Sequence, residues 1–355
     1  MICDSFRRTS KSRNVNALGV RIGPTMLRKW LPRILIATAL ASLLALAQLN
    51  VTQKRWYKGN LHTHTLNSDG DSTPDQVATW YREHKYNFLT LSDHNHLTDI
   101  AGLNAVHAAK EKFLLIPGEE VTDAYDKKPI HINSYNPASL GIPRHGTSVA
   151  DTIQNNVNEI LDTKGLPSLN HPNFGWAVTA QDLLAVKGLG LFEVYNGHPA
   201  VNNDGGGGFQ SLDEMWDVLL TAGQKLYGIG VDDAHHFKQI GREFSNPGKG
   251  WIQVRASELS ATAIAAAIGQ GDFYASSGVQ LSEVTTAGSD YRLTIEGADW
   301  EKMTTYFIGD GGKVLAKTFD RKAVYHFTGK EHYVRARVES SSGGKAWTQP
   351  VFPAR

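Results

Sequence analysis

Short apolar runs alternate with amphipathic stretches between residues 56 and 274, which is the pattern of repeated strand–helix units. The segment "NFLTLSDHN" (87–95) predicts a buried strand that enters a polar loop. Before it, "STPDQVATWYREHKY" (72–86) predicts a helix with Ser72 or Thr73 as the N-cap. The same reasoning predicts helices at 98–112, 148–165 and 211–223, and strands at 113–122, 166–172, 190–197 and 225–236. We therefore expect an α/β domain whose parallel sheet is closed, or nearly closed, into a barrel.

The pattern changes after "GDFYASSG" (271–278). From there on, apolar and polar residues alternate in short segments separated by Gly and Asp turns, which is typical of an antiparallel meander. We expect a small C-terminal antiparallel β module at 277–355. The glycine-rich segment "NNDGGGGFQ" (202–210) predicts a loop on the barrel, either a lid or an inert surface loop.

The N-terminal segment (1–47) has the proportions of a signal peptide. Basic residues precede an uncharged run at 34–47, which is shorter than the roughly 20 residues of a membrane span. Ala-Leu-Ala at 45–47 supplies a cleavage pattern, so we expect a mature chain from Gln48, with Met26 as an alternative start. This predicts a periplasmic or secreted protein without stable membrane association after cleavage. An uncleaved membrane anchor is the open alternative.

Charge and cysteine content narrow the classes of function. Residues 1–47 carry eight of the 36 Lys/Arg and one of the 35 Asp/Glu, which leaves 28 basic and 34 acidic residues, a net charge of −6. An acidic chain without a Lys/Arg cluster lacks the surface that nucleic-acid binding needs, so we expect no nucleic-acid partner. The only cysteine, Cys3, precedes the cleavage site. Any metal ion must therefore be held by imidazoles and carboxylates.

The predicted strands end in side chains that bind metal ions. These are His62, His64, Asp93, His94, Glu119, Glu120, His131, His171, Asp233 and His235. Residues two apart on a strand face the same way, and C-terminal strand ends of a barrel converge on one mouth, so we expect these side chains to meet. We interpret five other histidines as surface or core residues: His84, His107, His145, His326 and His332. Three more lie beside the motifs and stay open between both roles: His96, His198 and His236.

Five motifs in this order, "NLHTHTLNSDG", "LTLSDHN", "IPGEEVT", "LNHPN" and "GVDDAHH", resemble the polymerase and histidinol phosphatase (PHP) superfamily of metallohydrolases. The resemblance covers Trp56 to Tyr274. It implies a distorted (β/α)7 barrel of the PHP type, which we place at 48–276, and up to three metal ions. The stretches "EVYNGHP", "PGKGW", "GDFYASSG" and "AWTQPVF" further resemble an exported branch that includes carbaryl-hydrolase-like proteins and phosphoesterases.

The resemblance also implies a ligand set for each ion. The first ion would take His62, His64, Glu120 and Asp233. Glu120 would bridge to a second ion bound by His131 and His171. The third ion would take Asp69, His94 and His235. Glu119 remains an alternative to Glu120, and Asp232 an alternative to Asp233. The preference rests only on the Gly-x-Glu and Asp-x-His patterns of the superfamily.

Imidazole and carboxylate ligands suit two or three divalent transition metals, namely Zn, Mn or Fe. Such ions supply a bridging hydroxide at neutral pH, with Asp233 and His235 as proton acceptor or donor. We therefore predict a metal-dependent phosphoesterase (phosphodiesterase or phosphatase) that hydrolyses small soluble phosphodiesters or phosphomonoesters. The alternative is a metal-dependent carboxylesterase or carbamate hydrolase, for which Phe174, Trp176, Tyr195 and Phe209 would line the pocket. Asp93 is expected to orient an imidazole, and the oligomeric state stays open.

Overall fold

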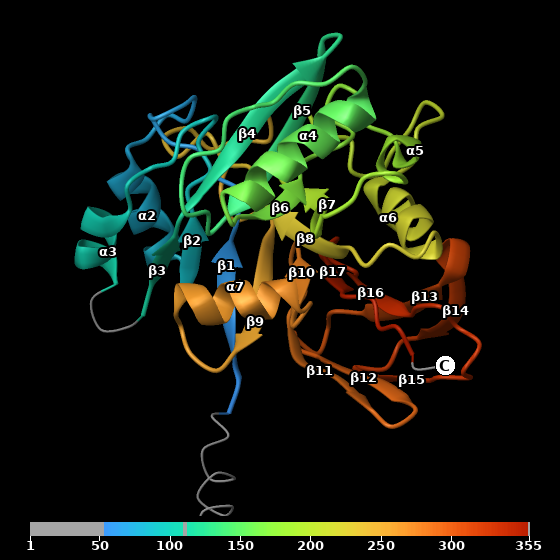
Figure 1. Ribbon diagram of the computed structural model, residues 1–355. Helices are drawn as coiled ribbons and strands as arrows, with labels where there is room; N and C mark the ends of the chain where they lie inside the picture. The colour runs from blue at the N-terminus through green and yellow to red at the C-terminus, as the bar shows by residue number, and fades with distance from the viewer. Residues whose placement is uncertain (1–52, 109–111, 354–355) are drawn as a thin grey trace, which may run out of the picture. The chain divides into compact units, whose positions relative to one another are not determined.

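The computed structural model of the protein describes residues 53–108 and 112–353 (Figure 1). The predicted signal peptide lies outside these residues. The helices are α2 (Pro74–Glu83), α3 (Ala101–His107), α4 (Val149–Asp162), α5 (Ala180–Leu183), α6 (Leu212–Thr221) and α7 (Ala261–Gly269), with a 3-10 turn η1 (Asp310–Gly312). Among the described helices, none combines the length and hydropathy that crossing a bilayer requires.

Five strands form one sheet in the order β4-β5-β6-β7-β8. They are β4 (Gly118–Tyr125), β5 (Lys128–Tyr135), β6 (Leu166–Leu169), β7 (Leu191–Asn196) and β8 (Tyr227–Val231). The pairs β6–β7 and β7–β8 are parallel, whereas β4–β5 and β5–β6 are antiparallel. Helix α4 packs against β4, β5 and β6, which covers one face of this sheet (Figure 1).

Nine strands form the second sheet in the order β14-β13-β16-β17-β10-β9-β1-β2-β3. They are β1 (Arg55–Asn60), β2 (Phe88–Thr90), β3 (Leu114–Ile116), β9 (Trp251–Ala256), β10 (Phe273–Ser276), β13 (Met303–Gly309), β14 (Lys313–Thr318), β16 (Arg335–Ser340) and β17 (Lys345–Thr348). A third sheet contains β11 (Leu281–Ala287), β12 (Asp290–Ile295) and β15 (Lys322–His326).

The prediction of an α/β fold is confirmed, but the closed parallel barrel is not. Within the described residues, the ends of the two larger sheets are joined by isolated bridges, Thr63 with Ala234 and His94 with Glu120. The hairpin β4–β5 turns at Asp126 and Lys127, which both have positive φ, and such a two-residue turn forces antiparallel pairing. Pro117 separates β3 from β4, which were predicted as one strand at 113–122.

The antiparallel strands predicted after residue 277 are present. The nine-stranded sheet, however, contains strands from before and after this residue. Ser276 in β10 pairs with Ala346 in β17, so strands from both sides belong to one sheet. The domain boundary after 276 therefore stays a prediction.

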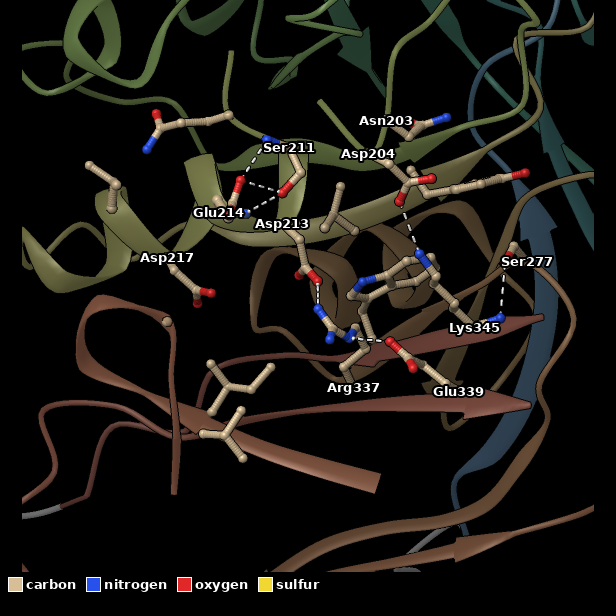
Figure 2. Close-up of a pocket in the computed structure, with 18 of the residues that line it drawn as sticks. Asn203, Asp204, Ser211, Asp213, Glu214, Asp217, Ser277, Arg337, Glu339 and Lys345 are labelled. Carbon is tan, nitrogen blue, oxygen red and sulfur yellow. Dashed lines mark hydrogen bonds and ion pairs between the residues drawn. The ribbon is translucent and has the colours of Figure 1, made fainter. Parts of the chain in front are cut away.

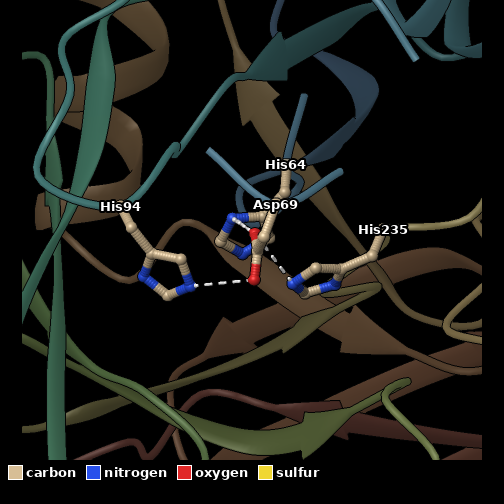
Figure 3. A group of neighbouring side chains, drawn as sticks. All are labelled: His64, Asp69, His94 and His235. Carbon is tan, nitrogen blue, oxygen red and sulfur yellow. Dashed lines mark ion pairs between the residues drawn. The ribbon is translucent and has the colours of Figure 1, made fainter. Parts of the chain in front are cut away.

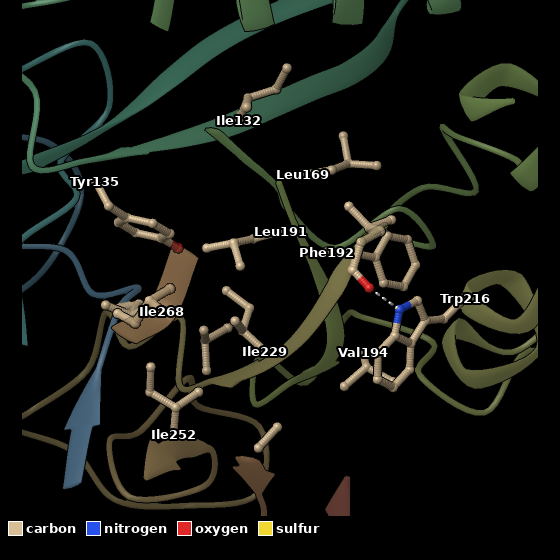
Figure 4. Packing of buried hydrophobic residues seen from close by; sticks show 14 of the residues in the cluster. Ile132, Tyr135, Leu169, Leu191, Phe192, Val194, Trp216, Ile229, Ile252 and Ile268 are labelled. Atoms are coloured by element: carbon tan, nitrogen blue, oxygen red, sulfur yellow. Dashed lines mark hydrogen bonds between the residues drawn. The ribbon is translucent and has the colours of Figure 1, made fainter. Parts of the chain in front are cut away.

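The main hydrophobic core includes residues of both larger sheets (Figure 4). Leu169, Phe192 and Ile229 come from neighbouring strands of the five-stranded sheet, and Ile252 comes from β9; all four are fully buried. Trp216 of α6 packs into the same cluster and donates Nε1–H to the carbonyl of Leu226 at 2.9 Å. This shared core holds the C-terminal ends of β1 and β8 beside each other, where the site lies.

Candidate metal centre

All nine predicted ligands lie in one cluster, which we call the metal-ligand cluster. They form four overlapping groups: His64, Asp69, His94 and His235; His62, His64 and Asp233; His62, Glu120 and His171; and His94, Glu120 and His131. The ligands follow β1, β2, β6 and β8 or lie within β4 and β5. Strand ends that are far apart in sequence therefore supply one site, as the sequence predicts.

Four donor atoms lie close together, as expected around one cation. The Nε2 atoms of His62 and His64 are 3.1 Å apart, and each lies 3.2–3.3 Å from Glu120 Oε2 and from Asp233 Oδ1. Ligand atoms that lie roughly 2.0–2.2 Å from the same ion have separations of about this size from one another. These four side chains fit a transition-metal ion, and they are the set expected for the first ion.

Glu193 of β7 orients His62, and sequence reasoning missed it. Its Oε1 lies 2.7 Å from His62 Nδ1, and its Oε2 accepts the backbone N–H of His171 at 2.7 Å. A carboxylate on Nδ1 fixes the tautomer in which the Nε2 lone pair faces the cluster. The sequence feature that could have indicated its role is a carboxylate inside the largely apolar strand "LFEVYN". A charge buried in such a strand needs a partner.

The other oxygen of Glu120 faces the ligands expected for the second ion. Oε1 lies 3.0 Å from His131 Nδ1 and 3.3 Å from His171 Nε2, and accepts a hydrogen bond from Asn170 Nδ2 at 2.9 Å. His131 Nδ1 is buried and has no well-oriented hydrogen-bond partner among the described residues, as expected of an atom placed for a metal ion. Glu120 is thus positioned to bridge two ions.

The ligands expected for the third ion surround Asp69 (Figure 3). Asp69 Oδ1 lies 3.3 Å from His235 Nε2 and 3.4 Å from His64 Nδ1, and Oδ2 lies 3.5 Å from His94 Nε2. Thr122 Oγ1 contacts His94 Nδ1 at 2.5 Å. Asp69 is half exposed, whereas the first ligand set is buried, so this group lies at the solvent side.

The structure shows which member of each acidic pair faces the cluster. Glu119 points away and accepts the backbone N–H of Gly141 at 2.7 Å. Asp232 points to the other side of its strand, where it accepts hydrogen bonds from Tyr81 and from the backbone of Gly250. Glu120 and Asp233 are therefore the cluster members.

Asp93 differs from its expected role. Its carboxylate accepts hydrogen bonds from the hydroxyls of Thr65, Ser68 and Thr98 and from the Thr65 backbone N–H, so it fixes the loop after His64. No imidazole is among the hydrogen-bond partners found for it in the described chain.

Two ligands have left-handed backbones, a conformation that residues other than glycine adopt at a cost of about 1–3 kcal/mol. His171 has φ of 24° and Asp233 has φ of 49°. Asn196 Nδ2 donates to Asp233 Oδ2 at 3.1 Å and so helps to hold the side chain of this strained residue in place. Such strain is concentrated where function requires a fixed geometry.

Opposite charges dominate the electrostatics of the cluster. Burial opposes ionisation of Glu120, yet the imidazoles around it, above all His62, hold its pKa well below the usual value. Burial likewise opposes ionisation of Asp233, and His62 again holds its pKa well below the usual range. Burial, together with the nearby His235, lowers the pKa of His64 to about 4. The two carboxylates are therefore anionic and His64 is neutral at pH 7, which are the forms that bind a metal ion.

The cluster opens into a cavity of about 240 Å³. Besides eight cluster members, only Phe174 and His198 line it among the described residues. His198 thus has the substrate-facing position that the sequence left open, whereas His96 is exposed and His236 lies beside Phe244. The five histidines predicted to be structural lie elsewhere; for example, His84 stacks on Trp80 and His145 contacts Asp123.

A larger cavity of about 1210 Å³ lies between α6 and the strands β13, β14, β16 and β17 (Figure 2). Several of its charged side chains pair with one another: Arg337 with Asp213 and Glu339, and Lys345 with Asp204. Tyr195 and Phe209 line this cavity rather than the metal cavity, and Trp176 stacks on Phe209 with ring centroids 4.5 Å apart. Of the four aromatic residues expected around the substrate, only Phe174 reaches the metal cavity.

No protein-family model and no curated protein matches this chain. A crystal structure from Bacteroides vulgatus, of a two-domain protein containing a predicted PHP-like metal-dependent phosphoesterase, is 17% identical; it covers 84% of this chain and 96% of its own, with a TM-score of 0.48. A candidate metal-dependent phosphoesterase from Bifidobacterium adolescentis is 13% identical, with coverages of 53% and 92% and a TM-score of 0.39. An amidohydrolase from Chromobacterium violaceum with bound sulfate and no metal is 17% identical, with coverages of 51% and 88% and a TM-score of 0.37.

The sequence motifs resemble the PHP superfamily, and the description of the structure from Bacteroides vulgatus also names a PHP-like protein. All three TM-scores are below 0.5, so these likenesses carry no argument about the substrate of this chain. The function has to be argued from the site itself.

Proposed function

We propose that this protein is a metal-dependent phosphoesterase that acts on small phosphodiesters. The observation that supports it most is the shared position of Glu120, whose two oxygens face two different groups of imidazoles. A structural metal site saturates one ion and favours thiolates, whereas overlapping sets without cysteine are typical of catalytic sites with adjacent ions.

The donor set fits two or three divalent cations and favours Zn, Mn or Fe. When bound, such ions activate a water molecule and polarise a phosphoryl oxygen. The first set holds His62, His64, Glu120 and Asp233, the second shares Glu120 with His131 and His171, and the third adds Asp69, His94 and His235.

The charge of the cavity favours an anionic substrate only when cations are present. Asp69, Glu120 and Asp233 contribute three negative charges, and no Lys or Arg lines the cavity in the described part of the chain. Two divalent ions would leave one positive charge, which matches the single charge of a phosphodiester. A third ion would leave three positive charges and would suit a phosphomonoester dianion, so metal content and substrate preference are linked.

The chain's own residues would position the substrate and move the proton. His235 donates Nδ1–H to the carbonyl of Asp233 at 2.9 Å, which leaves Nε2 facing the cavity. Asp233 lines the same cavity as an anion and is the proton acceptor in our proposal, with His235 beside it as donor or acceptor. Phe174 excludes water from one side.

The carboxylesterase or carbamate hydrolase alternative needs an apolar pocket. Only Phe174 of the four aromatic residues expected there lines the metal cavity, and the remaining lining consists of imidazoles and carboxylates together with no aliphatic side chain in the described residues. The lining therefore favours the phosphoester over a carboxylate ester with a large apolar group. Secretion to the periplasm or medium remains part of our proposal, based on the sequence of residues 1–47.

The test is turnover by the metal-reconstituted protein of three chromogenic substrates in parallel: a phosphodiester, a phosphomonoester and a carboxylate ester. We expect the diester to be the best substrate and His64→Ala to lower its kcat/KM at least about 100-fold, because a metal ligand is lost. His326→Ala, an exposed histidine outside the cluster, is the matched control and should keep full activity. Turnover of the carboxylate ester alone, or full activity in His64→Ala, would refute the proposal.

A further inference from the structure

A second cavity, of about 690 Å³, lies at the N-terminal ends of β1, β2 and β3. The metal-ligand cluster follows the C-terminal ends of β1 and β2, so the two sites are at opposite ends of these strands (Figure 1). Residues of β1, the α2–β2 turn, α3 and the segment before α7 line this second cavity. We call it the strand-start cavity.

Four exposed cationic side chains surround the strand-start cavity: Arg55, Arg82, Lys85 and Lys112. Among the residues that the structure describes, none of the four forms an ion pair with a carboxylate. One carboxylate, Glu258, also lines the cavity, and it accepts a hydrogen bond from Ser260 at 2.9 Å. Among the described lining residues, four cations thus stand against one anion, which is unusual in a chain with 34 acidic residues after residue 47.

One of these cations is held in place by a buried histidine. His107 is 3% exposed, and its Nε2 lies 2.8 Å from Asp75 Oδ1. His107 Nε2–H therefore donates to the Asp75 carboxylate, and the Nδ1 lone pair accepts a hydrogen bond from Nη1 of Arg82 at 3.1 Å. This chain of contacts fixes the Arg82 guanidinium at the cavity.

Two buried tyrosines are among the lining residues, and their hydroxyls have no hydrogen-bond partner in the described part of the chain. Tyr57 is 7% exposed and Tyr86 is 2% exposed. Buried tyrosines normally find one; Tyr81, next to them in the fold, donates to Asp232 at 2.8 Å. Burial raises the pKa of Tyr86 well above its usual value, so its hydroxyl keeps its proton and remains a donor.

We propose that the strand-start cavity binds a phosphate group through Arg82, the neighbouring lysines and the hydroxyls of Tyr57 and Tyr86. A phosphate offers several acceptor oxygens and at least one negative charge, which together would satisfy unpaired hydroxyl donors and unpaired cations. The phosphate would belong either to a soluble phosphorylated compound or to an anionic lipid headgroup, since both present the same oxygens. The cavity exceeds the size of one phosphate, so the rest of the ligand also has room.

The experiment uses the full chain with its metals and titrates inorganic phosphate by calorimetry. The test variants are Tyr57→Phe combined with Tyr86→Phe, and Arg82→Gln. Lys330→Gln, an exposed lysine in the C-terminal part, is the matched control. We expect each test variant to weaken one phosphate-binding event at least about tenfold, while Lys330→Gln leaves it unchanged and phosphodiester turnover is unchanged in all of them.

Thermal unfolding separates a binding role from a structural one. The tyrosine variants remove hydroxyls that have no partner, so without phosphate their unfolding temperature should equal or exceed that of the unmodified chain. With phosphate, the unmodified chain should gain stability and the variants should gain less. A large loss of stability without phosphate would show that the hydroxyls serve the fold and would overturn the proposal.

Co-sedimentation with lipid vesicles shows whether the bound phosphate belongs to a lipid or to a soluble compound. Co-sedimentation with phosphatidylglycerol vesicles, absent with phosphatidylcholine vesicles and lost in Arg82→Gln, would support a lipid headgroup. Binding of inorganic phosphate without vesicle binding would support a soluble ligand. If neither probe binds, or if the variants bind both as the unmodified chain does, the proposal fails, whatever the metal centre does.

Discussion

Glu193 has more influence on the metal-ligand cluster than its position in a strand suggests. It is fully buried, and its two oxygens hold His62 and the backbone of His171, while Asn196 Nδ2 donates to it at 2.8 Å. A buried carboxylate with these partners fixes one ligand of the first proposed ion and one of the second. Its effect should therefore appear in metal affinity rather than in the fold alone.

We predict that Glu193→Gln lowers the affinity for the first metal ion about 10- to 100-fold, because the amide orients His62 less well and makes Nε2 a weaker donor. Competition with a chromogenic chelator measures this change. Glu283→Gln, on an exposed strand, is the control and should bind metal normally. Unchanged affinity in Glu193→Gln would mean that His62 is oriented by other contacts.

At the scale of single residues, the motifs and their resemblance to the PHP superfamily named side chains that lie together in the structure, but not the residues that support them. The His-x-His pattern follows from strand geometry, and the motif registers select Glu120 and Asp233, which face the cluster. Glu193, Asn170 and Asn196 could not be selected from sequence, because a support is defined by its contacts and has no spacing rule. Asp93 illustrates this, since it neighbours His94 in sequence but fixes Thr65.

Helix α6 and strand β16 are joined by a buried ion pair. Arg335 is fully buried and donates Nε–H and Nη2–H to the two oxygens of Asp217 at 2.7 and 2.6 Å. Asp213 and the hydroxyl of Tyr333 complete the group. This group connects a helix of the predicted barrel to the predicted C-terminal module.

We predict that Asp217→Ala destabilises the fold by about 3–5 kcal/mol, because it leaves the buried Arg335 without its bidentate partner. Urea unfolding measures the loss. Asp204→Ala removes an exposed carboxylate that pairs with Lys345, and it should change stability little. Equal effects of the two substitutions would mean that Asp213 alone satisfies Arg335.

Elements with strong periodicity were predictable, and the hairpin was not. The prediction of a helix at 72–86 matches α2, and Thr73 caps it in a capping box with Gln76. Strand β5 was missed because its turn, Asp126-Lys127, lacks the glycine that marks such turns in sequence. Because of this one turn, the five-stranded sheet contains antiparallel as well as parallel pairs of strands.

The two larger sheets meet at the metal-ligand cluster through single bridges. His62, His64 and His94 come from the nine-stranded side, whereas Glu120, His131, His171 and Asp233 come from the five-stranded side. Bound ions would therefore add a link between the sheets at the place where a few backbone hydrogen bonds already join them. The sequence could not predict whether the strands form a closed barrel, because closure depends on these few contacts between the two sheets.

We predict that metal removal lowers the free energy of unfolding by about 3–4 kcal/mol, the linkage expected when free metal is 100 to 1,000 times its Kd. Thermal unfolding with and without a chelator measures the loss. His64→Ala should show a smaller chelator effect, since one ligand set is already incomplete. An unfolding temperature that is independent of metal would contradict the proposed ligation.

Strand β17 lies between β10 and β16 in the sheet although it is the last described strand along the chain. During synthesis, a chain that has reached Ser276 already carries every side chain of the metal-ligand cluster, but β10 still has an open edge. An unpaired strand edge invites pairing with other chains. The sheet can therefore close only after Lys345–Thr348 has emerged, and for an exported chain this means after translocation, so a holding chaperone is most useful until then.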